Sequence, residues 1–231
     1  MTFRSFASSS KGNAYMVSDG DTTILLECGL TLPKLKKAIG FTLSECSACF
    51  VTHEHKDHSH AAAQLIKLGI PVYMSEGTAQ ALELPEAEIL NPGETVQVGW
   101  LRIMPFRVWH DAAQPVGYLI DDVRTGERLL FAADTRNLDY APKRLTHIAI
   151  ECNYEEAVLS RSQRMPDKLK ERIRHTHMEV GDCIKYLHKL DLSKCLTVWL
   201  LHLSAGNSNE ESWMRQFFRE FPGLDIRICP E

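Results

Sequence analysis

Four side chains of types that bind divalent metal ions lie within six residues, in the order His53-x-His55-x-Asp57-His58. Imidazole and carboxylate groups suit zinc best and also bind manganese or iron. The apolar run at residues 48–52 predicts a strand that ends at this segment. At a strand end His53 and His55 point to one face, while Asp57 and His58 begin the turn into a helix. One loop can therefore serve two adjacent metal ions.

The alternative is a solvated loop with clustered histidines. It is disfavoured because crowded histidines repel one another when protonated and stabilise nothing without a metal. Three further ligand-type residues each follow a predicted apolar strand: His110, Asp134 and His202. Any one of them alone would more often be a capping or hydrogen-bonded polar residue. Beside the histidine cluster they become candidates, because a site for two metals needs more donors than one loop supplies.

Strands and helices that could position these residues alternate along the chain. The predicted strands lie at residues 13–18, 22–28, 48–52, 71–74, 147–151, 196–202 and 224–228, with further strands between 95 and 133. The predicted helices lie at residues 61–68, 76–84, 166–174, 180–189 and 209–221. No linker rich in Pro, Ser or Gly separates the two halves. We therefore expect one domain over residues 1–231, built as two sheets between outer helices.

Composition limits how the protein can hold a substrate. The formal net charge is -4 over 231 residues, so overall charge does not attract nucleic acid, and a local cluster or bound metal must do so. No apolar run is long enough for a signal peptide or a membrane span. Together with seven cysteines that lack a repeated CxxC spacing, this predicts a cytoplasmic protein with no membrane partner. The sequence does not indicate the oligomeric state.

The HxHxDH array, followed by a His, an Asp and a final His after successive strands, resembles the metallo-β-lactamase superfamily. Within it the chain is similar to the YycJ-type group (also called VicX or WalJ), nucleases related to RNase Z. The residues that carry the resemblance are 8–13, 51–58, 110–115, 133–135, 151–153 and 201–204. The resemblance implies an α/β (α+β) fold, the four-layer αββα metallo-β-lactamase sandwich.

The same resemblance implies a ligand set for two divalent ions, with Zn²⁺ expected and Mn²⁺ or Fe²⁺ as alternatives. The first ion would be held by His53, His55 and His110, the second by Asp57, His58 and His202, with Asp134 bridging both. Asp57 is also expected to be essential for catalysis. The chain departs from the usual pattern at Glu27, where the superfamily usually has Asp, and at Tyr154, where the subgroup usually has His.

Two metals about 3.5–4 Å apart activate a bridging hydroxide, which makes the reaction a hydrolysis but does not define the bond that is cut. His177 resembles the non-ligand histidine that protonates the leaving oxygen in RNase Z-like enzymes. Glu151 resembles the carboxylate that orients it. This pairing makes chemical sense because a sugar alkoxide is a poor leaving group and needs a proton. The alternative is that His175 and His177 are partly exposed residues near a helix start.

A basic stretch, residues 161–174, precedes His177 and holds six cations against two acids. It predicts a local surface that contacts backbone phosphates, and the alternative is a solvated helix face with i,i+4 ion pairs. The candidate substrate contacts are Lys56, Arg136, Arg161, Arg164, Ser204 and Asn207.

These features favour a phosphodiesterase that acts on DNA or RNA through attack of a metal-bridging hydroxide on phosphorus. A second hypothesis is a small-molecule hydrolase for a thioester, a lactone or a cyclic phosphodiester. A third is a non-catalytic metal-binding or adaptor protein, which the complete ligand set disfavours.

Overall fold

Central strands of the molecule bury both of their faces. The computed structural model describes residues 1–40, 42–163, 165–204, 206 and 208–230. In strand β3 (Thr23–Leu26), Ile24 and Leu26 point into one hydrophobic cluster and Leu25 into another. Strand β10 (Arg128–Ala132) alternates in the same way, because successive side chains of a strand point to opposite faces. Such strands need a packing layer on each side.

The described residues form two sheets. The first has the order β1-β2-β3-β4-β5-β6 and begins with an antiparallel hairpin, after which β3 to β6 run parallel. Besides β3, its strands are β1 (Thr2–Ser9), β2 (Gly12–Ser18), β4 (Cys46–Phe50), β5 (Val72–Met74) and β6 (Glu88–Ile89).

The second sheet has the order β13-β12-β11-β10-β9-β8-β7. Strands β7 to β10 are antiparallel and β10 to β13 are parallel. Besides β10, its strands are β7 (Val96–Val98), β8 (Leu101–Arg107), β9 (Val116–Asp122), β11 (His147–Glu151), β12 (Thr197–Leu201) and β13 (Asp225–Ile228).

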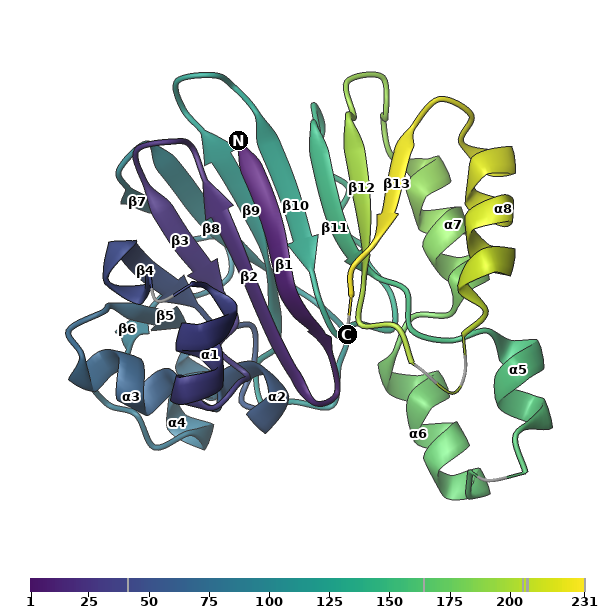
Figure 1. Cartoon of the computed structure of the whole chain (residues 1–231), viewed down its shortest axis with the longest axis horizontal. Coiled ribbons are helices and arrows are strands. Elements are labelled where there is room, and N and C mark those ends of the chain that lie inside the picture. The colour runs from purple at the N-terminus through teal and green to yellow at the C-terminus, as the bar shows by residue number, and fades with distance from the viewer. Residues whose placement is uncertain (41, 164, 205, 207, 231) are drawn as a thin grey trace.

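Helices lie on the outer faces of both sheets, as Figure 1 shows. Those beside the first sheet are α1 (Leu32–Ala38), α2 (Lys56–Ser59), α3 (Ala62–Lys67) and α4 (Glu76–Ala81), and those beside the second are α5 (Glu156–Arg161), α6 (Asp167–Thr176), α7 (Val180–Lys189) and α8 (Glu210–Glu220). Three hydrophobic clusters fill the spaces between layers: one between the sheets and one between each sheet and its helices. The predicted αββα sandwich is confirmed.

Most observed elements match the predicted ones, and the additions include β1, β6, α1 and α5. Strand β1 was not predicted, because its segment alternates poorly between apolar and polar residues. Helices α1 and α5 were not predicted either; α1 begins beside Pro33, a residue that suits a first helical turn. The structure describes no helix long and apolar enough to cross a membrane.

The parallel strands β3 and β4 of one sheet and β10, β11 and β12 of the other end at the same edge of the sandwich, near α2 (Figure 1). The loops that follow parallel strands are where polar groups of α/β proteins converge. The fold therefore directs several distant loops of the chain to one place.

Candidate metal centre

The structure brings together seven donor side chains that are spread over 150 residues of sequence. They divide into two groups whose donor atoms lie within 4.8 Å of one another: His53, His55 and His110 in the first, and Asp57, His58, Asp134 and His202 in the second. The donors occupy the loop after β4, the short helix α2, and the loops after β8, β10 and β12. Each loop contributes one or more donors because its strand ends at the shared edge.

The first group has the spacing of a tetrahedral site. His55 Nδ1 lies 3.0 Å from His53 Nε2 and 3.3 Å from His110 Nε2. Two nitrogens bound to zinc at about 2.0–2.1 Å in tetrahedral geometry are about 3.3 Å apart. In His53 and His110, the ring nitrogen that does not face this group has a hydrogen-bond partner. His53 Nδ1 contacts Thr52 Oγ1, and His110 Nδ1 donates to the Thr176 carbonyl. Such partners fix the orientation of ligating rings.

The second group surrounds a neighbouring point. His58 Nε2 is 3.4 Å from Asp57 Oδ2 and 3.4 Å from Asp134 Oδ2, and His202 Nε2 is 3.8 Å from Asp57 Oδ2. Asp134 Oδ2 is also 3.7 Å from His110 Nε2, which belongs to the first group. The Asp134 carboxylate thus lies between the two groups, where a bridging ligand would be.

Among the described residues, His202 Nε2 is a buried donor atom of the second group without a hydrogen bond, and buried Asp134 Oδ1 makes no hydrogen bond but lies 3.0 Å from His202 Nδ1. Leaving such groups unsatisfied costs about 1–3 kcal/mol each. The His202 backbone also adopts a left-handed conformation, with φ 55°. Unsatisfied polar atoms and strained backbone tend to persist at functional sites. The seven donors therefore fit two divalent metal ions.

The pKa of His53, in the first group, shifts in the opposite direction to those of His58 and His202, in the second. Burial lowers the pKa of His53 well below its ordinary value, and the neighbouring His58 adds to this effect. Burial also lowers the pKa of His58, but the carboxylates of Asp134 and Glu27 outweigh it, so this pKa is raised well above the ordinary value. The same competition between burial and Asp134 raises the pKa of His202 to about 10. A metal ion entering the second group displaces protons, so its affinity increases with pH.

Glu27, the departure from the usual superfamily aspartate, lies behind the ligands. This fully buried carboxylate accepts hydrogen bonds from the Thr52 hydroxyl (2.5 Å) and the Thr52 amide (3.2 Å), and its Oε1 lies 3.3 Å from His58 Nδ1. Its backbone has φ 65°, which ends strand β3 and turns the side chain toward α2. The longer side chain still reaches His58.

The adjoining loop packs tightly against α2. A Cβ on Gly29 would lie 1.6 Å from the Asp57 carbonyl oxygen, so no other residue fits there. The Asn13 side-chain amide donates to the same carbonyl (3.1 Å), and Asn13 lies near the start of β2, beside the turn of the β1–β2 hairpin. These contacts hold Asp57 and His58 against the first sheet.

We expect Glu27→Gln to weaken metal binding about 10- to 100-fold, because the neutral amide no longer holds the His58 ring by charge. Metal affinity is measured by competition with a chromogenic chelator. Glu127→Gln is the matched control, since Glu127 is a partly buried carboxylate at the far end of the second sheet, beside the amino terminus. Equal affinities of the Glu27→Gln variant and the wild type would show that Glu27 does not support the metal ligands.

His177 and Glu151, predicted as a pair, are in contact. His177 Nδ1 donates to Glu151 Oε1 at 2.6 Å, and Glu151 is fully buried and also accepts from the Thr135 amide (2.6 Å). Burial lowers the pKa of His177, but the Glu151 carboxylate outweighs it and raises the pKa above its ordinary value. His177 Nδ1 is also 3.9 Å from Asp134 Oδ2. His177 directly follows α6, whereas His175 is exposed within it.

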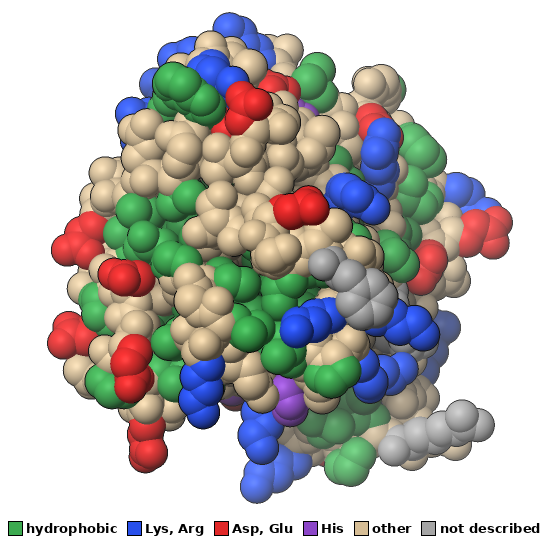
Figure 2. All heavy atoms as spheres, turned by 60° about the vertical axis from the view of Figure 1, so that its left-hand side comes forward, with side chains coloured by type: hydrophobic (Ala, Val, Ile, Leu, Met, Phe, Trp, Pro, Cys, Tyr) green, Lys and Arg blue, Asp and Glu red, His purple; other side chains and the backbone are tan. Residues whose placement is uncertain are grey.

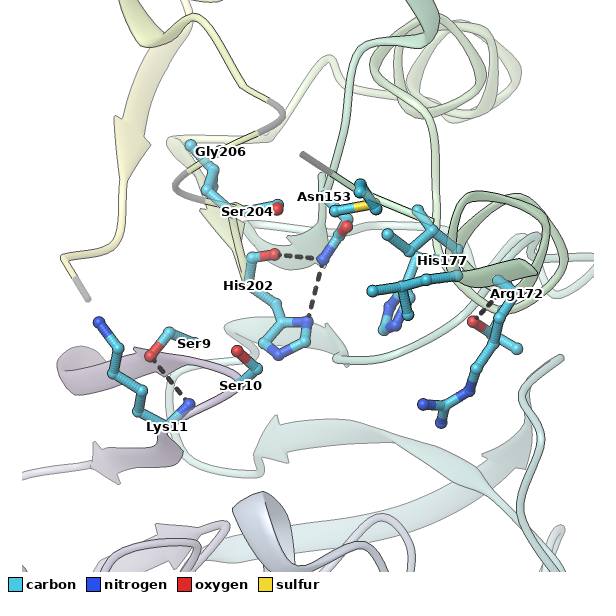
Figure 3. A pocket seen from close by; sticks show the side chains of 14 residues that line it. Ser9, Ser10, Lys11, Asn153, Arg172, His177, His202, Ser204 and Gly206 are labelled. Carbon is cyan, nitrogen blue, oxygen red and sulfur yellow. Dashed lines mark hydrogen bonds between the residues drawn. The ribbon is translucent and has the colours of Figure 1, made fainter. Parts of the chain in front are cut away.

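A cavity of about 350 Å³ opens beside His177 and His202. Ser204, a predicted substrate contact, lines it together with Arg172, Asn153 and the β1–β2 loop, as Figure 3 shows. Asn153 holds His202 in place by donating to its carbonyl oxygen at 2.7 Å. The cavity therefore combines hydroxyl, amide and cationic groups next to the metal-binding donors.

The other predicted substrate contacts are more scattered. Lys56 is the exposed first residue of α2, and Arg136 is exposed in the loop after β10. Arg161 ends α5 and lines surface hollows to which none of the seven donors contributes, among the residues described. Arg164 and Asn207 lie outside the described residues.

The basic stretch is partly neutralised by acids elsewhere in the chain. Arg174 pairs with Glu156 (2.6 Å), Arg172 with Asp111 (2.9 Å), and Lys170, which is buried, with Asp167 (3.6 Å). Asp111 was not singled out from the sequence, although it follows a candidate ligand directly. Its Oδ1 lies 3.2 Å from His110 Nε2, so it connects Arg172 to the first metal-binding group.

Comparison with known proteins gives consistent matches over most of the chain. It is 28% identical to the exodeoxyribonuclease YycJ of Bacillus anthracis (90% of this chain, 84% of the relative) and 27% identical to the exodeoxyribonuclease WalJ of Streptococcus pneumoniae (89% and 82%). The crystal structure of the metallo-β-lactamase fold protein YhfI from Bacillus subtilis is similar, with a TM-score of 0.74 and 15% identity over 98% of this chain and 95% of that one. The β-lactamase superfamily domain matches residues 22–202, and the chain belongs to this superfamily.

Proposed function

We propose that the protein is a metal-dependent phosphodiesterase that hydrolyses DNA. The observation that carries the proposal is the His177–Glu151 pair, at 2.6 Å, placed beside the metal-binding donors, with His177 lining the cavity and Glu151 buried behind it. A histidine held in this way suits a reaction whose leaving group needs a proton. The similarity to YycJ and WalJ, both exodeoxyribonucleases, supports DNA as the substrate, and RNA is the nearest alternative.

The chemistry of the donors favours two Zn²⁺ ions, with Mn²⁺ or Fe²⁺ as alternatives. A pair of divalent ions lowers the pKa of bound water and stabilises the charge on the attacking and leaving oxygens. We assign His53, His55 and His110 to one ion, and Asp57, His58 and His202 to the other, with Asp134 shared.

The protein's own groups perform the remaining steps. Because His177 Nδ1 is bound to Glu151, Nε2 is the atom that donates a proton to the leaving 3′ oxygen. The Glu151 charge stabilises the protonated ring before transfer and fixes its orientation. Ser204 and Arg172 line the cavity and contact the phosphate that is cut, while Lys56, Arg136 and Arg161 contact phosphates further along the strand.

The distribution of charge on the surface agrees with binding of a polyanion by a few local cations. On the face in Figure 2, the left edge carries mostly acidic side chains, whereas basic ones lie over the upper, right and lower parts, with some acidic side chains among them. With a net charge of -4, steering of a polyanion depends on individual cations near the centre.

A second candidate function is hydrolysis of a small phosphodiester or thioester. The volume of the cavity beside His177, about 350 Å³, favours it, because pockets of about 300–1,000 Å³ typically hold small molecules.

The test is hydrolysis of labelled single- and double-stranded DNA and RNA by protein loaded with zinc, manganese or iron. We expect cleavage of DNA that EDTA abolishes and added metal restores. Failure to cut any nucleic acid with any of these metals would contradict the proposal. Turnover of a cyclic nucleotide or a thioester by the same preparations, without DNA cleavage, would favour the second candidate.

A further inference from the structure

A second, larger cavity of about 590 Å³ lies on the other side of Thr176 from the one described above. It runs between α7, the end of α6 and the loops that follow β8 and β10. Thr176 lines both cavities. The Arg172–Asp111 ion pair connects them, since Arg172 lines the smaller cavity and Asp111 the larger. We call the larger cavity the strand groove.

An exposed tryptophan forms one wall of the strand groove. Trp109 is 62% exposed. It lines the groove and directly precedes the candidate ligand His110 in the sequence. Its indole N–H donates to Asp139 Oδ2 (2.9 Å), and its backbone N–H donates to the Thr135 hydroxyl (3.1 Å). The ring is therefore held in a fixed orientation while much of its surface faces solvent. A fixed, exposed aromatic ring is a platform on which a nucleic-acid base can stack.

Cations line the same groove. The Arg136 amide donates to the Trp109 carbonyl oxygen (2.8 Å), which fixes Arg136 beside the tryptophan. Neither Arg136 nor Lys189 has a carboxylate within 4.0 Å among the described residues. These two cations are therefore available to phosphates.

The acids of the groove, in contrast, already have partners. Asp182 pairs with Lys185 at 2.7 Å, and Asp111 pairs with Arg172. Asp139 accepts from the Trp109 indole. Their charges are thus partly offset, and the repulsion that they exert on a phosphate backbone is reduced.

We propose that the strand groove binds unpaired nucleotides next to the phosphodiester bond that is cut. Bases stack on Trp109, and the backbone phosphates contact Arg136 and Lys189. The inference deepens the proposed function and rests on it. The location supports it, because Trp109 and Arg136 lie on the same loops as the candidate ligands His110 and Asp134. A strand in this groove therefore continues directly from the metal centre.

Binding of phosphorothioate oligothymidylates, which resist hydrolysis, tests the groove with metal-loaded protein. Fluorescence anisotropy compares oligomers of two and of twelve nucleotides. We expect the wild type to bind the longer oligomer more tightly, and Trp109→Ala to weaken that binding about tenfold. Trp109→Phe keeps a stacking ring and is expected to bind within about threefold of the wild type. Trp100→Ala is the matched control, since Trp100 is 46% exposed in the turn before β8.

Salt dependence tests the cations. For a single strand, log affinity falls with log salt concentration, and each phosphate contact that is lost makes this negative slope shallower by about 0.7. We expect the slope for the longer oligomer to be shallower by about 1.4 in the Arg136→Ala/Lys189→Ala double variant, and an unchanged slope would contradict the two phosphate contacts.

The outcomes separate this inference from the proposed function. If the wild type cuts DNA but Trp109→Ala binds the longer oligomer as tightly as the wild type does, the strand groove is refuted and the proposed function stands. Equal losses in the Trp109→Ala and Trp109→Phe variants would also refute stacking. If the wild type cuts no nucleic acid, the proposed function itself fails.

Discussion

Replacing Asp134 by alanine is expected to lower kcat/KM for DNA by about 10³-fold or more and to leave at most one tightly bound metal ion per chain. Asp134 is the carboxylate between the two donor groups, 3.4 Å from His58 Nε2 and 3.7 Å from His110 Nε2. Its loss removes the shared ligand and the negative charge that offsets the surrounding imidazoles. Metal content is measured by elemental analysis and activity on a labelled oligonucleotide.

Asp121→Ala is the matched control for this variant. Asp121 is a partly buried aspartate of β9, and it pairs with Arg102 and Arg128 at the opposite end of β10 from Asp134. We expect its metal content and kcat/KM to equal those of the wild type. Two metals per chain and DNA cleavage within about tenfold of the wild type in Asp134→Ala would contradict the bridging assignment.

The His177→Ala variant is expected to lose about 10²- to 10⁴-fold in kcat on DNA while keeping its metal ions. The rate falls because the variant no longer has the histidine that donates a proton to the leaving sugar oxygen. A p-nitrophenyl phosphodiester has a leaving group that departs without protonation, so its hydrolysis should fall by less than about tenfold. The comparison of the two substrates isolates the proton transfer from any general damage to the site.

His188→Ala is the control, because His188 is an exposed histidine of α7 whose ring contacts Glu220, on α8. It should behave as the wild type on both substrates. An equal loss on DNA and on the p-nitrophenyl ester in His177→Ala would show that His177 does not act as the general acid. A loss of metal ions would point to a role for His177 as a ligand instead.

The candidate ligands could be predicted because a short stretch of sequence is enough to show that each of them follows a strand. His110, Asp134 and His202 each follow an apolar run that is long enough to predict a strand. Parallel strands then place the residues that follow them at one edge. Little tertiary information is needed beyond that rule, which is why the metal centre is the most predictable part of the molecule.

The environment of the basic stretch could not be predicted in the same way. Arg172 pairs with Asp111, and Arg174 with Glu156, so the partners are 61 and 18 residues away in sequence. Ion pairs between distant segments leave no periodic pattern. The same holds for the contacts of Asn13 and Gly29 with Asp57, which depend on how the β1–β2 hairpin packs against α2.

The spread of the donors along the chain imposes an order on their biosynthesis. The three histidines of the first group all precede residue 111, whereas the second group lacks a donor until His202 is synthesised. At translation rates of about 5–20 residues per second, His202 follows His110 by about 5–20 s. The ribosome thus completes the three-histidine group well before it completes the second group of donors.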